Sequence, residues 1–422
     1  MLKYYLGLLV CLHCTECTFC QNAIKGQVVN LENGMPLPSV SIYLNNTSLG
    51  TITNEQGIFL ISKIPPGKFT LVATCIGYET FDSVVDLRDL SKLFNIKLKP
   101  KPEELESFSV LPTDPGGWEK YGKYFTLLLL GSTLNSNNCK LMNPEVIRFR
   151  LNADNTLIAF AKEPLLVMNY TLGYEIRYKL EDFDCNLSTA LVNYSGYSFY
   201  KDMSIQHPKK ARKYSEARLE AYRGSLLHFM RSFYANDLEV QGFEMRSLGK
   251  ISNPEKDRAK LMFSSHRDSV ILDTVSKSFY APISKMDPAN DYIHTVTVNT
   301  VDSTSIFKKM LKQPDSVISH QLITADSIGF AADSTIAGLY FKDSLEVSYK
   351  LKDIPARYRA LSKEHKHETY PISQFVFVNK TPVFVIINGF YYKPYDLKIT
   401  GYWAWFENMS TWLPFDYSPN HK

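Results

Sequence analysis

Apolar and polar residues alternate through the first hundred positions, in short runs separated by turns. Runs of this kind occur at IKGQVVN, SVSIYLNN, GIFLISKI, GKFTLVATCIGYE and LFNIKLK. The turns at Asn33-Gly34, Asn54–Gly57 and Pro65–Gly67 contain residues that favour a fixed or a positive φ. Several short alternating strands joined by such turns predict a small β-sandwich over residues 22–98.

The pattern changes to a helical period after a linker at residues 99–117, which is rich in Pro and charge. From Trp118 onward, large apolar residues recur every three or four positions up to Leu129, which predicts a helix. Strands follow at VIRFRLNADNTLIAFA and PLLVMNYTLGYEIRYKLEDFDCN. A second helix is predicted at about 211–234, where Leu219, Tyr222, Leu226, Phe229 and Phe233 form an apolar stripe. Residues 118–242 therefore form an α+β region.

Residues 243–422 consist mainly of predicted strands, with a polar loop at residues 355–373. The strands are RAKLMFSS, DSVILDTV, YIHTVTVNTV, TIAGLYF, SLEVSYKL, QFVFVN, VFVIINGFYY and DLKITGYWAWF. Trp403 and Trp405 are two apart in the last of these, so we expect them on one side of a strand. Buried there, they would anchor the C-terminal segment; exposed, they would stack on sugar rings. The fold class is mainly β with an α+β middle.

The first twenty residues have the order of an export signal. Lys3 precedes an apolar run that is followed by small residues, which predicts a signal peptide at residues 1–20 with cleavage between Cys20 and Gln21. Four of the seven cysteines lie in this segment. Lipid attachment would need a small residue directly before the cysteine, whereas Val10 precedes Cys11 and Phe19 precedes Cys20. Beyond the signal, no apolar run approaches the length of a membrane helix.

Composition adds limits on partners and on cysteine chemistry. The chain has 422 residues, 45% of them hydrophobic, and a formal charge of +4, which is too weak to indicate a nucleic-acid partner. After signal removal Cys75, Cys139 and Cys185 remain. An odd number of cysteines in an oxidising compartment allows at most one disulfide, for which Cys139–Cys185 is the candidate pair, and Cys75 is expected in the core of a strand.

Particular residues of the predicted sandwich carry a resemblance to a known domain. Gly26, Pro36–Pro38, Gly57, Pro66-Gly67 and Ile76–Tyr78 match the carboxypeptidase regulatory-like domain. That domain is a transthyretin-like β-sandwich found in exported Bacteroidota proteins, so the resemblance implies the same fold and an exported protein. LESFSV in the linker looks like the short strand that follows this domain in TonB-dependent outer-membrane transporters.

The rest of the chain resembles a group of exported Bacteroidota proteins with the same N-terminal domain. The segments that carry this resemblance are CKLMNPEVIRF, PLLVMNYTLGYEIRYKLEDF, YSGYSFY, EARLEAYRGSLLHFMRSF and GYWAWFENMSTWLPFDYSP. It implies an architecture and a compartment, and no activity.

Two groupings have the residue types of an active site. His365–Glu368 offers the letters of a zinc-binding His-x-x-Glu, but in a loop rich in lysine, and it is better explained as a solvated loop. Ser225 and His228 lie three apart on the second predicted helix. A serine inside a helix lacks an exposed turn and an oxyanion site, so we expect Ser225 to allow close packing and His228 to line the core. We therefore predict no catalytic residue, no metal ligand and no cofactor.

A third pattern is Asp followed by Ser or Thr and then Thr or an aliphatic residue, which looks like the acceptor triplet of Bacteroidota O-glycosylation. The alternative is that these pairs are ordinary turn and strand-entry residues. The candidate acceptors are Ser83, Ser269, Thr274, Ser303, Ser316, Ser327, Ser334 and Ser344.

Taken together, these patterns predict an exported, non-catalytic protein of the periplasm or outer membrane, with a binding, docking or assembly role. We expect an envelope or outer-membrane protein as its partner. One alternative is a glycan- or peptidoglycan-binding protein that uses Trp403 and Trp405. Another is a hydrolase that joins His228 or the His365–Glu368 loop to an acid from elsewhere in the chain.

Overall fold

The N-terminal strands pack into a sandwich, as the alternation predicts. The computed structural model describes residues 22–65, 67–86, 93–101, 113–189, 191–265, 309–361, 368–392 and 396–419. The first sheet has the order β4-β1-β7 and the second the order β3-β2-β5-β6, with β1 and β7 parallel and the other pairs antiparallel. The strands are β1 (Asn22–Asn30), β2 (Ser41–Leu44), β3 (Gly50–Ile52), β4 (Ile58–Ile64), β5 (Lys68–Thr74), β6 (Phe81–Asp86) and β7 (Phe94–Leu98).

The middle region is a six-stranded sheet covered by a helix. Its strand order is β8-β11-β12-β10-β9, and β13 pairs with β12. Phe125 and Leu129 of α2 are fully buried, and the Phe125 ring contacts Phe149 edge-on. The elements are α2 (Gly117–Leu130), β8 (Cys139–Leu141), β9 (Ile147–Leu151), β10 (Thr156–Ala161), β11 (Leu165–Asn169), β12 (Tyr174–Asn186), β13 (Leu191–Asp202) and α3 (Ala211–Tyr222), with short 3-10 turns at η1 (Asn135–Asn138), η2 (Pro144–Val146) and η3 (Pro208–Lys210).

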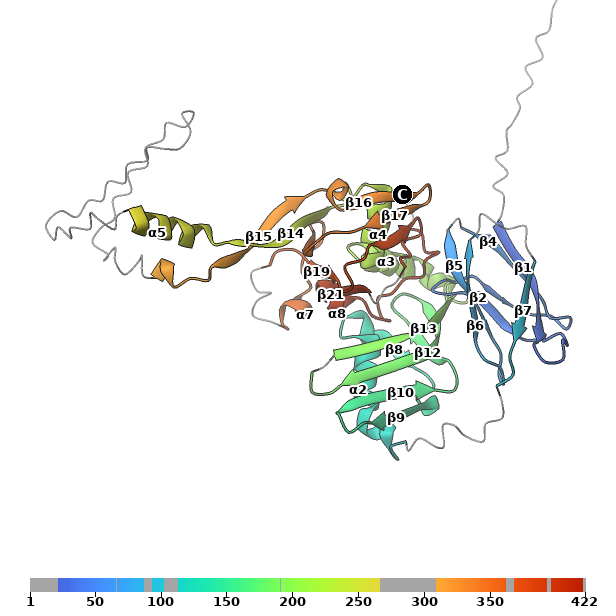
Figure 1. Ribbon diagram of the computed structural model, residues 1–422. Helices are drawn as coiled ribbons and strands as arrows, with labels where there is room; N and C mark the ends of the chain where they lie inside the picture. The colour runs from blue at the N-terminus through green and yellow to red at the C-terminus, as the bar shows by residue number, and fades with distance from the viewer. Residues whose placement is uncertain are drawn as a thin grey trace, which may run out of the picture.

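The C-terminal region has a five-stranded sheet, β15-β14-β18-β19-β21, and a three-stranded sheet, β16-β17-β20. In Figure 1 the hairpin of β14 and β15 extends away from the rest of the molecule and ends at α5. The elements are α4 (Leu226–Ala235), β14 (Phe243–Ser252), α5 (Pro254–Ser265), β15 (Ser316–Ile323), η4 (Ala325–Ser327), β16 (Gly329–Asp333), β17 (Ile336–Leu339), β18 (Ser344–Tyr349), α7 (Ala356–Arg359), β19 (Ile372–Phe377), β20 (Val383–Ile386), β21 (Leu397–Gly401) and α8 (Tyr402–Phe406).

Two sequence predictions about these elements are wrong. The segment RAKLMFSS lies in helix α5, which starts at Pro254 with Glu255 and Asp257 in its first turn. The segment YWAWF is helix α8, because Gly401 has a φ of 76° that ends β21. The predicted strands DSVILDTV and YIHTVTVNTV lie outside the described residues.

The single helix predicted at about 211–234 is two helices that belong to different cores. Gly224 has a φ of 73°, and Ser225 then caps α4 by accepting a bond from the backbone N–H of His228. Ala221 of α3 packs with the middle sheet, whereas Phe229 of α4 packs with the C-terminal sheet. The two cores therefore meet at this break.

The break at Gly224 also allows a test of how closely Tyr349 packs against this position. A Cβ on Gly224 would lie 2.5 Å from the Tyr349 ring. A left-handed residue that gains a Cβ loses about 1–2 kcal/mol, and overpacking adds about 1–3 kcal/mol. We predict that Gly224→Ala lowers the free energy of unfolding, measured by chemical denaturation, by more than Gly116→Ala. Gly116 has a φ of 71°, and its nearest neighbour is the Glu119 carboxylate at 3.5 Å. Equal losses would contradict the clash.

Candidate functional site

The loop that joins β2 to β3 is inserted into the rest of the molecule. The backbone N–H of Asn46, whose φ is 56°, donates to the Ser198 carbonyl at 2.9 Å, and the N–H of Tyr200 donates to the Thr47 carbonyl at 2.9 Å. Thr47 forms a parallel bridge with Phe199 of β13. Backbone hydrogen bonds thus join the sandwich to the edge of the middle sheet, which fixes position more firmly than a linker alone.

The C-terminal tail closes over this loop from the other side. The N–H of Phe415 donates to the Asn46 carbonyl at 2.6 Å, and Asp416 accepts bonds from both the N–H (2.9 Å) and the hydroxyl of Ser48. Arg231 of α4 donates to the carbonyls of Phe415 and Tyr417 at 3.0 and 2.9 Å. We call the contact of residues 45–48, 198–200 and 415–417 the junction.

The residues just before the junction contribute to all three hydrophobic cores. Trp403 is buried in the C-terminal core and Met409 in the middle core, and Phe415 packs against the core of the sandwich. The Trp403 indole donates to the Gly224 carbonyl at 2.9 Å, and the Trp405 indole donates to the Ser132 hydroxyl at 2.8 Å. The prediction that these tryptophans anchor the C-terminal segment is confirmed. Because they are buried or partly buried on a helix, they do not form an exposed stacking face.

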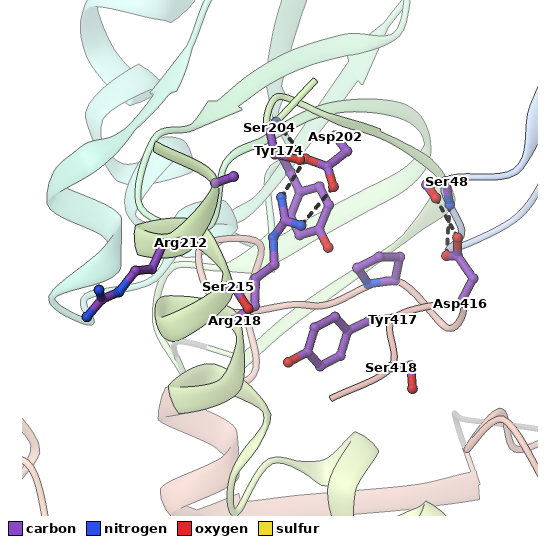
Figure 2. A pocket seen from close by; sticks show the side chains of 12 residues that line it. Ser48, Tyr174, Asp202, Ser204, Arg212, Ser215, Arg218, Asp416, Tyr417 and Ser418 are labelled. Carbon is purple, nitrogen blue, oxygen red and sulfur yellow. Dashed lines mark hydrogen bonds and ion pairs between the residues drawn. The ribbon is translucent and has the colours of Figure 1, made fainter. Parts of the chain in front are cut away.

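Beside the junction lies a cavity of about 500 Å³ (Figure 2). It is bounded by four parts of the chain: the β2–β3 loop, the middle sheet, α3 and the C-terminal tail. Its lining residues are Ser48, Tyr174, Asp202, Ser204, Ala211, Arg212, Ser215, Arg218, Pro414, Asp416, Tyr417 and Ser418.

Arg218 is the buried charge of this cavity. Its guanidinium makes two bonds of 2.8 Å to the Asp202 carboxylate and lies 3.9 Å from the centre of the Tyr174 ring. It also donates to the carbonyls of Leu172 and Gly173 at 2.7 and 2.9 Å. Burial by itself raises the pKa of Asp202, but the bonds from Arg218 and Ser204 outweigh it and hold that pKa at about 2. Arg218 is therefore fully used in holding Tyr174 and β13 in place.

The remaining lining is hydroxyl-rich and has no free cation among its residues. Arg212 points away from the centre of the cavity in Figure 2 and pairs with Glu216 at 2.8 Å. Ser204, Ser215 and Ser418 supply hydroxyls, and Tyr417 supplies one partly exposed ring. Such a lining can hydrogen-bond a polar, uncharged molecule, whereas the Asp416 carboxylate disfavours an anion.

Ser225 and His228, which have the residue types of an active site, do lie close together, but both have structural roles. Ser225 caps α4, while Nδ1 of buried His228 accepts a bond from the N–H of Gly224 at 3.2 Å. Its Nε2 lies 3.2 Å from Oε1 of Gln241. Glu407, which sequence reasoning missed, accepts a bond of 2.7 Å from the N–H of Leu226, the first residue of α4. The serine, the histidine and the glutamate thus all satisfy groups around the start of one helix.

The predicted Cys139–Cys185 disulfide is wrong, because both cysteines are free thiols. Cys139 lies opposite Asn169, which pairs with Tyr174 at the start of β12. Cys185 lies eleven residues further along that strand, which at ~3.3 Å per residue is far beyond the Cα separation of a disulfide. Burial raises the pKa of the Cys139 thiol to about 12.

The other predicted positions are untested or lie outside the described residues. Residues 1–20, the cleavage site at Cys20 and Gln21, His365, Ser269, Thr274 and Ser303 fall outside them. Ser327 and Ser334 are exposed. Ser83, Ser316 and Ser344 are partly buried in strands. Their glycosylation stays a prediction.

Within the described ranges, no group of three or more His, Cys, Asp or Glu side chains gathers as a metal site. Of the helices that the structure describes, none has the length and apolar character needed to cross a bilayer.

Comparison with known proteins identifies the sandwich. Residues 24–110 match the family model of the CarboxypepD_reg-like domain, as the sequence motifs predict. The TonB-dependent receptor P39 of Formosa agariphila is 30% identical over 91 residues. That match covers 22% of this chain and 8% of the receptor, so the chain spans a small part of the length of this relative. Both findings point to an envelope-associated protein, and neither assigns an activity.

Two ionisable groups at the start of α4 predict how the stability of the protein depends on pH. Burial lowers the pKa of His228 to about 4, so the unfolded chain binds a proton that the folded chain excludes, and stability falls as the pH drops from about 6.5 to 4. Burial raises the pKa of Glu407 to about 7, against the opposing bond from Leu226, so stability falls as the pH rises from about 4.5 to 7. In the parent protein the two dependences oppose each other.

We therefore predict that Glu407→Gln exposes the contribution of His228. Its free energy of unfolding should rise with pH between about 4 and 6.5, by on the order of 2 kcal/mol, relative to the parent. Denaturant titrations at several pH values measure this difference. Glu239→Gln, at an exposed position, is the matched control. The same pH slope in Glu407→Gln and the parent would contradict the assignment.

Proposed function

We propose that this protein is a non-catalytic component of the cell envelope that docks to an outer-membrane protein. The CarboxypepD_reg-like domain and the similarity to a TonB-dependent receptor support the compartment and this class of partner. The predicted signal peptide agrees with both.

The observation that carries the proposal is the junction. Asn46, Ser48 and Asp416 join the sandwich to the body by backbone and side-chain bonds, and Phe415 adds an apolar contact. A sandwich that served only as a flexible spacer would not need these bonds. The proposed partner surface spans the sandwich and the body, whose relative position the junction holds constant.

We predict that Asp416→Lys abolishes partner binding. The substitution removes both acceptors of Ser48 and leaves a cation that cannot accept a bond. The full chain would be tagged and expressed in its own envelope, then cross-linked and purified. Outer-membrane proteins should co-purify with the parent and with Asp343→Lys, which makes the same charge change at an exposed position. Equal enrichment with Asp416→Lys, or no outer-membrane protein with the parent, would contradict the proposal.

The cavity beside the junction favours a second function, binding of a neutral saccharide. Its hydroxyls and the ring of Tyr417 suit a polyhydroxylated ring, and its one buried cation is already neutralised by Asp202. In this second proposal, the glycan alternative uses the cavity beside the junction and not Trp403 and Trp405.

We predict that neutral oligosaccharides bind the parent protein. Tyr417→Ala should weaken this binding at least tenfold, because it removes one stacked ring together with its hydroxyl. Isothermal titration calorimetry measures the affinity. Tyr170→Ala, which removes a tyrosine that is 40% exposed elsewhere on the middle domain, should bind like the parent. No heat of binding with the parent would reject this second function and leave the docking proposal intact.

A further inference from the structure

Among the residues that the structure describes, the outer edge of β15 in the β14–β15 hairpin has no paired strand. β15 is the outermost strand of the five-stranded sheet, and within the described residues it pairs only with β14. Its eight residues, SVISHQLI, include no Lys, Arg, Asp, Glu or Pro. Ile318 and Leu322 are 63% and 61% exposed. Free edges of this length are normally protected by charge, proline or a covering segment.

The opposite edge of the same sheet has such protection. β21 has five residues, includes exposed Lys398 and leads through Gly401 directly into α8, which contacts it. In the described part of the chain, the sheet is therefore protected on one side and open for pairing on the other. An open edge pairs with an extended strand by backbone hydrogen bonds.

The sequence of β15 is chemically self-complementary. In an antiparallel pair about a two-fold axis, residues of equal parity face each other across the axis. If His320 lies on that axis, Ile318 of one copy lies opposite Leu322 of the second copy. On the other face, Val317 lies opposite Ile323. Apolar residues then meet apolar residues at these two positions on either side of the axis, whereas the centre of the pair is polar, with Ser319 opposite Gln321 and the two His320 rings opposite each other.

The same pairing extends the contact beyond the strand. β15 runs from the end of the hairpin next to α5 back to η4, so an antiparallel copy sets its own α5 beside Ala325–Ser327. At that place lies a cavity of about 420 Å³ whose lining includes Phe233 and Phe330, the latter 46% exposed. Leu261 of α5 is 68% exposed. Apolar surface is thus present at both ends of the paired strands.

We propose that two copies of this chain pair through β15, antiparallel and with His320 on the two-fold axis, so that the two five-stranded sheets form one continuous sheet. The occupant of the edge is a second copy of the chain, because the matched residues follow from the β15 sequence itself. The Nδ1 atom of each His320 lies 3.7 Å from the carboxylate of Glu346 in the same copy, so a carboxylate lies on either side of the axis.

Cysteine cross-linking tests the register. His320→Cys places two thiols directly opposite each other, at the Cβ separation of a cross-strand pair. Ile318→Cys alone places them four residues apart along the strands, at ~13 Å, beyond the reach of a disulfide. We expect oxidation of the full chain to cross-link His320→Cys at least about tenfold more than Ile318→Cys or the parent. The double variant Ile318→Cys/Leu322→Cys should cross-link like His320→Cys.

A charge exchange tests the contact without any covalent bond. His320→Lys and His320→Asp each set like charges against themselves, and each should raise the dimer dissociation constant by about tenfold. A mixture of the two variants should restore dimers, because Lys then lies opposite Asp. Analytical ultracentrifugation measures all three samples.

Several outcomes would overturn the proposal. A parent chain that stays monomeric, because another part of this chain or a different protein occupies the edge, is one. Cross-linking at Ile318→Cys alone would reject the register, and a mixture that dimerises no better than its components would reject pairing at His320. The docking function is read out separately by co-purification with Asp416→Lys, so the two proposals fail independently.

Discussion

The arrangement of this protein depends on where residues 403–415 are buried. Between Trp403 and Phe415 the chain places a side chain in or against each of the three hydrophobic cores in turn. Full burial of one large apolar side chain stabilises by roughly 1.5–3 kcal/mol. A segment that contributes to every core therefore couples all three domains, in addition to the backbone bonds between the β2–β3 loop and β13.

Hydrogen bonds from two arginines add a fixed orientation to these apolar contacts. The three nitrogens of the Arg231 guanidinium donate to the carbonyls of Asn388, Phe415 and Tyr417. The three nitrogens of the Arg218 guanidinium donate to Asp202 and to two carbonyls of the middle domain. The planar guanidinium suits this use because its donors have fixed directions. The apolar contacts hold the segment in place, and the arginines determine the angle at which the tail reaches the sandwich.

The proposed function depends on the same fixed arrangement of the domains. The residues that most resemble catalytic groups, Ser225 and His228, satisfy the start of α4, where Glu407 joins them. The surfaces for which we propose interactions include the cavity beside the junction and the edge of β15, and both are held by the body of the protein. The proposed docking role agrees with the envelope association that the CarboxypepD_reg-like domain indicates.

Local chemistry decided which predictions from the sequence alone succeeded. The sandwich could be predicted because its turns and alternation are properties of neighbouring residues, and the α2 helix because its apolar spacing is local too. The break at Gly224 and the helix at Trp403 could not, since each depends on a positive φ that only the packing of Tyr349 or the end of β21 makes necessary. The separation of Cys139 from Cys185 and the meeting of Asp416 with Ser48 arise from strand order and from contacts over more than 360 residues. Pairings at such distance along the chain are set by the tertiary structure, because no local pattern encodes which segments will lie side by side.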